Sequence, residues 1–231
     1  MKKFFLIVLA GLAGVIAALM TLPKSSKLRN DQGTDLVSTQ GEAGSAMIES
    51  PKVRVANRKA LVKQMTDEVE KVEDGKWLRS WRLTERSGKE MGSEELKGTP
   101  YIASFFFATC PVVCVRQNDQ VRLLQEKFKK LPIKLVSITC DPENDTPEKL
   151  AEYATRMTAD PDRWLFFTGD WNYLQRISAE VFFNGLHQPK EHIEKFLLFS
   201  AEGKLIAEYD WHSPEEMKIL EGDVRALFEK K

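Results

Sequence analysis

The chain has 231 residues, which suffices for one domain of ordinary size together with an anchor and a linker. Its 34 Lys and Arg residues balance 34 Asp and Glu residues, so the composition lacks the strongly basic character of a general nucleic-acid-binding protein and we expect no nucleic-acid partner. Three cysteines are too few for the disulfide framework of a small secreted protein.

An uncharged apolar run follows the N-terminal lysines and extends from Phe4 to Leu22. As a helix rising ~1.5 Å per residue it would reach ~28 Å, about the thickness of a bilayer's hydrocarbon core. The alternative is a cleaved signal peptide, but such a peptide has a shorter apolar stretch and ends in small residues. We therefore expect a transmembrane anchor at residues 1–23, with the bulk of the chain on the outer (periplasmic or equivalent) side of the membrane.

Residues 24–76 are interpreted as a linker with a short helical lead-in. From Pro23 to Pro51 the sequence is rich in Ser, Gly, Thr, Gln and Asp, and it has too few large apolar residues to offset the entropy of ordering. From Val53 to Val72 apolar residues recur at a helical spacing among charges. This pattern predicts a helix that either leads into the domain or faces a partner.

Residues 77–231 alternate strand and helix patterns and are expected to form the domain. The predicted elements are, in chain order, a hairpin within Ser80–Met91 with a Ser-Gly turn, a buried strand at Tyr101–Ala108, a helix at about Val115–Lys130, a strand at Ile133–Thr139, a helix opened by Thr146 and Pro147, a strand at Trp164–Gly169, a helix at Asn172–Val181, a hairpin of Lys195–Phe199 and Leu205–Tyr209, and a helix at Pro214–Phe228. This order predicts an α/β fold with a mixed sheet flanked by helices.

Two of the cysteines, Cys110 and Cys114, follow the predicted strand Tyr101–Ala108 and open the next helix. Backbone N–H groups at a helix start favour a thiolate, and positions i and i+4 share one helical face. Two soft thiolates with a third ligand suit Cu(I), but the same pair also forms disulfides or binds zinc, which normally takes four protein ligands or three and a water. Plain packing as small buried hydrophobes is the remaining alternative.

The stretch from about Trp81 to Leu227 resembles the Sco/SenC family of copper proteins. The resemblance rests on LKGTPYIASFFFATCPVVC, on SITCDPENDTPEKLAEY, on a histidine eleven residues before the glycine of the last hairpin turn, and on the N-terminal anchor. It implies a thioredoxin-like fold, a copper cofactor, and a chaperone that delivers copper to, or matures, the copper centre of a respiratory oxidase such as cytochrome c oxidase. The implied partner is a copper-receiving oxidase subunit or another copper protein.

The resemblance also implies a ligand set, namely Cys110, Cys114 and His192, with His187 as the alternative histidine. Asp141 is expected either to orient a ligand or to serve only the turn in DPENDTP. Cys140 is expected to be a buried thiol at a strand end, or else a third thiol that resolves a mixed disulfide.

A thiol-disulfide oxidoreductase that reduces a partner's cysteines is the competing hypothesis. It uses the same redox pair, Cys110 and Cys114, and metal binding and disulfide formation exclude one another because the metal binds the dithiolate. His192 distinguishes the two hypotheses, since copper binding requires the imidazole and disulfide exchange does not.

Overall fold

The protein is described by a computed structural model that covers residues 50–71 and 77–229. The expected anchor at residues 1–23 and most of the expected linker lie outside these residues. Within the described ranges, no helix has both the length and the apolar composition that crossing a bilayer would require.

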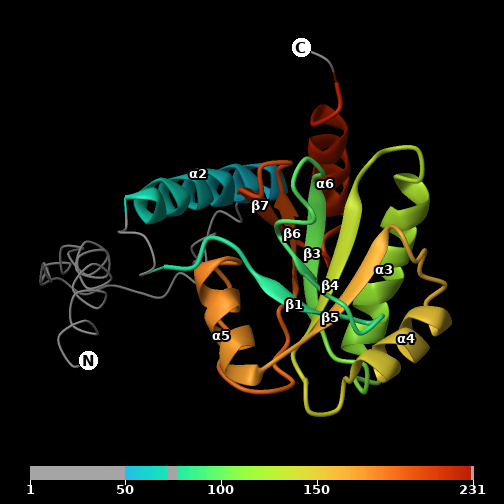
Figure 1. The fold of residues 1–231 in the computed structure, drawn as a ribbon. Coiled ribbons are helices and arrows are strands. Elements are labelled where there is room, and N and C mark those ends of the chain that lie inside the picture. Colours follow the sequence, from blue (N-terminus) through green and yellow to red (C-terminus); the bar gives the residue numbers. More distant parts are fainter. Residues whose placement is uncertain (1–49, 72–76, 230–231) are drawn as a thin grey trace, which may run out of the picture. The chain divides into compact units, whose positions relative to one another are not determined.

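The centre of the domain is a mixed seven-stranded sheet with the order β2-β1-β5-β4-β3-β6-β7 (Figure 1). The strands are β1 (Arg82–Glu85), β2 (Glu90–Gly92), β3 (Tyr101–Phe106), β4 (Lys134–Thr139), β5 (Trp164–Thr168), β6 (Lys195–Phe199) and β7 (Leu205–Asp210). The three central strands β3, β4 and β5 run parallel, and the β1-β2 and β6-β7 hairpins add antiparallel edges. The predicted mixed sheet is therefore confirmed.

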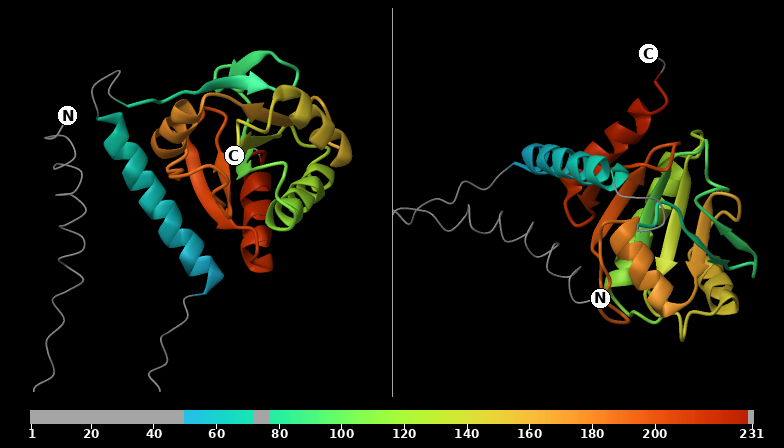
Figure 2. Two further views of the ribbon diagram at one scale, coloured as in Figure 1. Left: turned by 90° about the horizontal axis from the view of Figure 1, so that it is seen from below. Right: turned by 60° about the vertical axis from the view of Figure 1, so that its left-hand side comes forward.

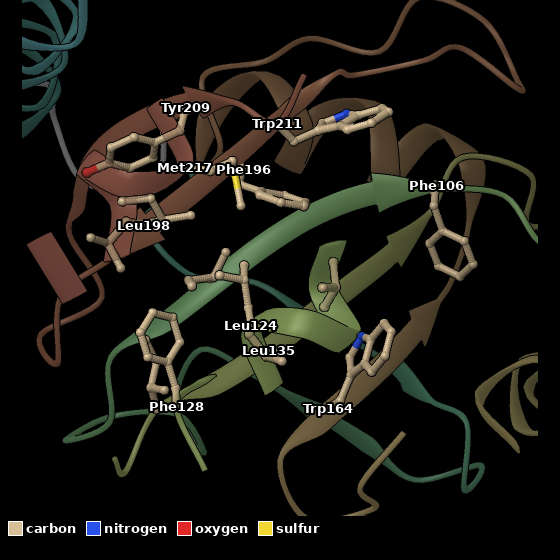
Figure 3. Close-up of a cluster of buried hydrophobic side chains, with 14 of the residues drawn as sticks. Phe106, Leu124, Phe128, Leu135, Trp164, Phe196, Leu198, Tyr209, Trp211 and Met217 are labelled. Atoms are coloured by element: carbon tan, nitrogen blue, oxygen red, sulfur yellow. The ribbon is translucent and has the colours of Figure 1, made fainter. Parts of the chain in front are cut away.

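The helices cover both faces of this sheet (Figures 1 and 2). They are α2 (Pro51–Glu70), α3 (Val113–Lys127), α4 (Pro147–Arg156), α5 (Trp171–Glu180) and α6 (Pro214–Ala226). Helices α3, α4 and α6 contribute to the hydrophobic cluster on one face, and α5 contributes to the cluster on the other. Figure 3 shows the first cluster, in which Phe106, Trp164 and Phe196 of three different strands meet side chains of α3 and α6.

Local sequence explains where these elements begin and turn. Four helices start at a Ser, Thr or Asp whose side chain accepts a backbone N–H of the first turn, and Thr146 followed by Pro147 is the predicted example. In the two hairpins, Gly88 and Gly203 have φ of 81° and 78°, which L-residues with side chains rarely adopt. Both hairpin turns lie where the sequence predicted them.

Helix α2 packs against the edge strand β7 and belongs to the same compact unit as the sheet. Its two buried apolar residues enter different clusters, Val55 on one face of the sheet and Val62 on the other. A carboxylate of α6, Glu216, is fully buried and accepts hydrogen bonds from Arg58 at 2.6 and 2.7 Å and from Arg54 at 3.2 Å. The helix expected between linker and domain thus covers the open edge of the sheet.

Candidate metal centre

Three segments that carry the predicted site residues meet at one end of the sheet, where the parallel strands finish. Cys110 and Cys114 follow the carboxyl end of β3, and Cys140 and Asp141 follow the carboxyl end of the parallel neighbour β4. Strand β6 pairs antiparallel with β3, so its start lies beside the end of β3, and His192 precedes that start by three residues. Ligand sites in α/β sheets commonly form at this end of the sheet, outside the carboxyl ends of the parallel strands.

Cys110 takes the place of a capping side chain at the start of α3. The N-cap residue Val112 makes no side-chain cap, and the Cys110 Sγ accepts a hydrogen bond from the backbone N–H of Cys114 at 3.3 Å. Burial alone would raise the pKa of the Cys110 thiol, but hydrogen bonds from the backbone of Cys114 and Val112, together with the Cys114 thiol and the backbone of Val113, hold that pKa below its ordinary value. Cys110 is therefore the more readily ionised thiol of the pair.

Cys114 lies deeper and faces the histidine. Its Sγ is 3.7 Å from the Nδ1 of His192, and one donor atom each from Cys110, Cys114 and His192 lie within 4.8 Å of one another. Burial raises the pKa of Cys114 to about 12, and the neighbouring Cys110 adds to the rise. Both sulfurs are buried while the imidazole is exposed, so the cluster opens to solvent on the histidine side.

The segment that carries His192 is held from three directions. The Lys190 backbone N–H donates to the carbonyl of Cys140 at 2.9 Å, and the Gln117 side chain donates to the carbonyl of Ile193 at 3.4 Å. The ring of Phe107, from the end of β3, lies 5.0 Å from the imidazole ring between centroids. Gln117 and Phe107 were not among the predicted site residues, since glutamine and phenylalanine give no distinctive signal in a sequence.

Asp141 contacts the histidine segment through Lys190. The Asp141 carboxylate is buried, accepts hydrogen bonds from the Asn144 side chain at 2.9 and 3.0 Å, and pairs with the Lys190 ammonium at 3.5 Å. Lys190 has a φ of 62°, a left-handed conformation that is uncommon for a residue with a side chain. Asp141 thus serves the turn and also contacts a residue two positions before His192.

A second carboxylate of the same motif, Asp145, supports the cysteine loop and was not predicted. It is buried, and its Oδ2 accepts hydrogen bonds from the Thr139 hydroxyl at 2.5 Å and from the Ala108 backbone N–H at 3.0 Å. Burial raises the pKa of Asp145, against the effect of these two hydrogen bonds. The only signal in the sequence was its place in DPENDTP, which does not distinguish one aspartate from the other.

The remaining candidate residues, Cys140 and His187, and the third histidine of the chain, His212, lie outside the three-residue cluster. Cys140 is fully buried, packs in the cluster on the α5 face, and has a pKa raised well above its ordinary value by burial. His187 is exposed, and its backbone N–H donates to Glu191 at 2.6 Å. His212 is exposed and stacks on Trp211 with 3.6 Å between ring centroids. Among the described residues, His192 is thus the histidine that lies with the thiols.

The donor set fits one soft metal ion. With the bond lengths known for zinc, ~2.3 Å to sulfur and ~2.0 Å to imidazole nitrogen, three donors spread evenly around one ion lie ~3.7–4.0 Å apart. The three donor atoms lie within 4.8 Å of one another, so side-chain adjustments of about 1 Å or less bring them to the separations that one ion requires. Two thiolates and one imidazole are soft or borderline donors, which favour Cu(I) or zinc over the hard cations.

Comparison with known proteins gives one consistent result. The model of the family described as SCO1/SenC matches residues 69–226. A SCO1/SenC family lipoprotein from Bacillus anthracis str. Ames is similar with a TM-score of 0.61 and 28% identity, over 66% of this chain and 96% of that chain.

Two further solved structures share the fold at lower identity. BsSco, described as a Sco family cytochrome c oxidase assembly protein with a disulfide switch, has a TM-score of 0.59 and 24% identity over 69% of this chain and 99% of that chain. Yeast Sco1 with copper bound has a TM-score of 0.54 and 22% identity over 66% of this chain and 92% of that chain. These likenesses confirm the expected thioredoxin-like fold. Helix α2 lies almost wholly before the matched residues.

Proposed function

Because this chain belongs to the SCO1/SenC family, we propose that it binds one Cu(I) ion through Cys110, Cys114 and His192 and delivers it to the copper centre of a respiratory oxidase. The observation that carries this proposal is the grouping of two sulfurs and one imidazole nitrogen within 4.8 Å. The metal is the protein's cargo, so the site has to hold copper and also release it.

Each ligand has a distinct part in holding and releasing the cargo. Cys110, with its lowered pKa, provides a thiolate at the start of α3, where the helix dipole stabilises its charge. Cys114 has a raised pKa, so its thiol proton has to leave when copper binds, and a proton returns to it when copper departs. His192 is the exposed ligand, and a receiving protein approaches the ion from its side. Cu(I) keeps its oxidation state throughout.

Membrane attachment completes the proposed function. The apolar run Phe4–Leu22 is long enough to anchor the chain, and the domain would then stand on the outer side of the membrane. An anchored domain stays close to a membrane-bound oxidase, which raises its effective concentration at the receiving site.

The thiol-disulfide oxidoreductase remains the second candidate function. It is favoured by the closeness of the two thiols, whose sulfurs lie within 4.8 Å of one another. In that reaction a Cys110 thiolate would attack a partner's disulfide, and Cys114 would then displace the partner's thiol as the Cys110–Cys114 disulfide forms. His192 would have no required role.

The test of the proposed function is metal content after anaerobic reconstitution with Cu(I). We expect one copper per reduced chain, and close to none in Cys110→Ser or Cys114→Ser. Cys140→Ser is the matched control, because that thiol lies outside the donor cluster and should leave one copper bound. Reduced wild-type protein that binds no copper would contradict the proposal.

A further inference from the structure

A groove between α3 and α6 lies beside the proposed copper site. The residues that line it include Arg116, Leu123, Lys127, Trp211, His212 and Lys218. None of them is a proposed copper ligand, and the proposed function does not use them.

The groove adjoins both segments that carry the ligands. On one side, Arg116 follows Cys114 by two residues in α3. On the other side, the His212 ring nitrogen lies 3.7 Å from the carboxylate of Glu194, which follows His192 by two residues. A protein segment that occupied the groove would therefore bring its own molecule next to the exposed face of the copper site.

The charge of the groove is positive although the whole chain has zero net charge. Its lining has three cationic side chains, those of Arg116, Lys127 and Lys218, against the single carboxylate of Glu221. Glu221 pairs with Lys127. Within the described part of the chain, the side chains of Arg116 and Lys218 form no ion pair. These two cations are thus available to carboxylates of a partner, which would be attracted over a distance of about 10 Å at moderate salt.

The groove also has an apolar component. Leu123 is 45% exposed, and the buried residues Met217 and Trp211 lie beside it in the lining. Trp211 belongs to the cluster shown in Figure 3, and its indole Nε1 is buried without a hydrogen-bond partner in the described residues. An occupant with both apolar side chains and carboxylates would match the apolar lining and the two cations, whereas a purely acidic ligand would leave the apolar surface in contact with water.

We propose that this groove docks an acidic, amphipathic segment of the copper-receiving domain of the oxidase. This inference rests on the proposed function. Cationic groups at the rim would speed encounter and orient the partner, and the apolar lining with Trp211 would stabilise the complex once water is excluded. In such a complex, copper would pass from the site to the receiving domain on the exposed side, where His192 lies.

The test measures copper transfer from the full-length chain, purified in detergent and loaded with Cu(I), to the purified copper-free and reduced copper-binding domain of the oxidase from the same organism. In the double variant Arg116→Glu, Lys218→Glu, we expect the second-order rate constant at low ionic strength to fall at least ~10-fold, with a smaller difference at high salt. Copper affinity should stay unchanged, because neither residue is a ligand. The control is Lys89→Glu, Lys149→Glu, the same charge change on the β1-β2 turn and on α4.

The outcomes separate the two proposals. If wild type transfers copper and the groove variant does so at the rate of the control, the groove proposal is overturned and the proposed function stands. If wild type binds copper but transfers none to the oxidase domain, both fall. A salt-sensitive dimer seen by sedimentation without the oxidase domain, and lost in the groove variant, would assign the groove to self-association and also overturn the proposal.

Discussion

Lys190 illustrates how a residue outside the donor cluster is placed to set the position of a proposed ligand, His192. It pairs with Asp141 and is hydrogen-bonded through its backbone to Cys140, both at the end of β4, while His192 follows two residues later. An ion pair with one exposed partner is worth at most ~1 kcal/mol. We therefore expect Lys190→Met and Asp141→Asn each to weaken Cu(I) binding by about two- to fivefold.

A chelator-competition titration of both single variants and the double variant tests this expectation. The double variant should bind about as well as either single variant, because the two changes remove the same interaction. Lys195→Met is the control, since it breaks a nearby surface pair with Asp210 that does not hold the histidine segment. Fully additive losses would show that Lys190 and Asp141 act on copper independently.

The three thiols make a second residue-level prediction. The sulfurs of Cys110 and Cys114 lie within 4.8 Å of one another, whereas Cys140 is fully buried in the cluster on the α5 face. Mild oxidation of the copper-free protein should therefore join Cys110 to Cys114 and leave Cys140 as a free thiol. Peptide mass mapping after alkylation checks the pairing. A main product that contains Cys140 in a disulfide would instead support the resolving role that the sequence left open.

At the residue scale, the sequence indicated which side chains have the right chemistry, but it did not indicate which residues from distant segments lie close together. The i, i+4 spacing of the cysteines and their place after a buried strand are local, so they were predictable from residue order. The choice between His192 and His187 depends on how a loop lies across the sheet, which no local pattern gives, so the expectation of His192 rested on family resemblance. In the structure the Nδ1 of His192 lies 3.7 Å from the Sγ of Cys114, and His187 lies outside the donor cluster. Asp145 was missed because its contacts, to Thr139 and Ala108, combine two strand ends that no local pattern relates.

Among the elements, α2 allows a specific prediction about stability. The Glu216 carboxylate is fully buried and depends on Arg58, whose side chain is 18% exposed, for its closest charged contact at 2.6 Å. Removing that partner leaves a buried charge poorly compensated, which typically costs 3 kcal/mol or more. We expect Arg58→Ala to lower the free energy of unfolding by about 3 kcal/mol.

Lys63→Ala is the matched control on the same helix, because its pair with Asp67 is exposed and such i, i+4 pairs are worth ~0.3–0.5 kcal/mol. Urea unfolding of both variants gives the comparison. Equal losses in the two variants would show that α2 is held by its apolar contacts and that the buried ion pair contributes little.

The same carboxylate predicts a pH dependence. Burial alone would raise the pKa of Glu216, but hydrogen bonds from the Asp210 backbone and Arg58 hold that pKa below its ordinary value. A depressed pKa in the folded state contributes stability above the unfolded-state value of ~4.3, and that contribution is lost as pH falls through the folded-state pKa. The stability difference between wild type and Arg58→Ala should therefore be full at neutral pH and shrink below about pH 4. A difference that stays constant down to pH 3 would contradict this assignment.

Element boundaries were largely predictable, and the position of α2 was not. The periodicity of apolar residues, the helix caps and the turn residues predicted the positions of the strands and of the later helices, because these signals are local. Examples are the N-cap Thr146 and the turn residue Gly203. The apolar spacing in residues 53–72 predicted a helix, but α2 buries only Val55 and Val62, and no local pattern indicated that it packs across the edge strand β7. Its attachment depends on ion pairs with α6, more than 150 residues further along the chain.

At the scale of the whole molecule, the topology explains why the proposed site residues meet at one end of the sheet. Parallel strands β3 and β4 end there, antiparallel β6 begins there, and α3 starts there, so cysteines, aspartates and a histidine separated by up to 82 positions, from Cys110 to His192, come together. The family match covers this sheet and its helices, and α2 lies almost entirely before it. In chain order, α2 thus lies between the expected membrane anchor and the residues that the family match covers.

The measurement that tests the central claim most directly is the Cu(I) affinity of His192→Ala beside His187→Ala and wild type, by chelator competition under reducing conditions. If copper is bound by both thiolates and the imidazole, His192→Ala should lower the affinity at least ~10-fold, since loss of even an outer-shell partner of a metal ligand costs about that much. His187→Ala should bind as wild type does, and the Cys110–Cys114 disulfide should still form in both variants. Equal copper affinity in all three proteins would contradict the copper site proposed here and favour the thiol-disulfide oxidoreductase.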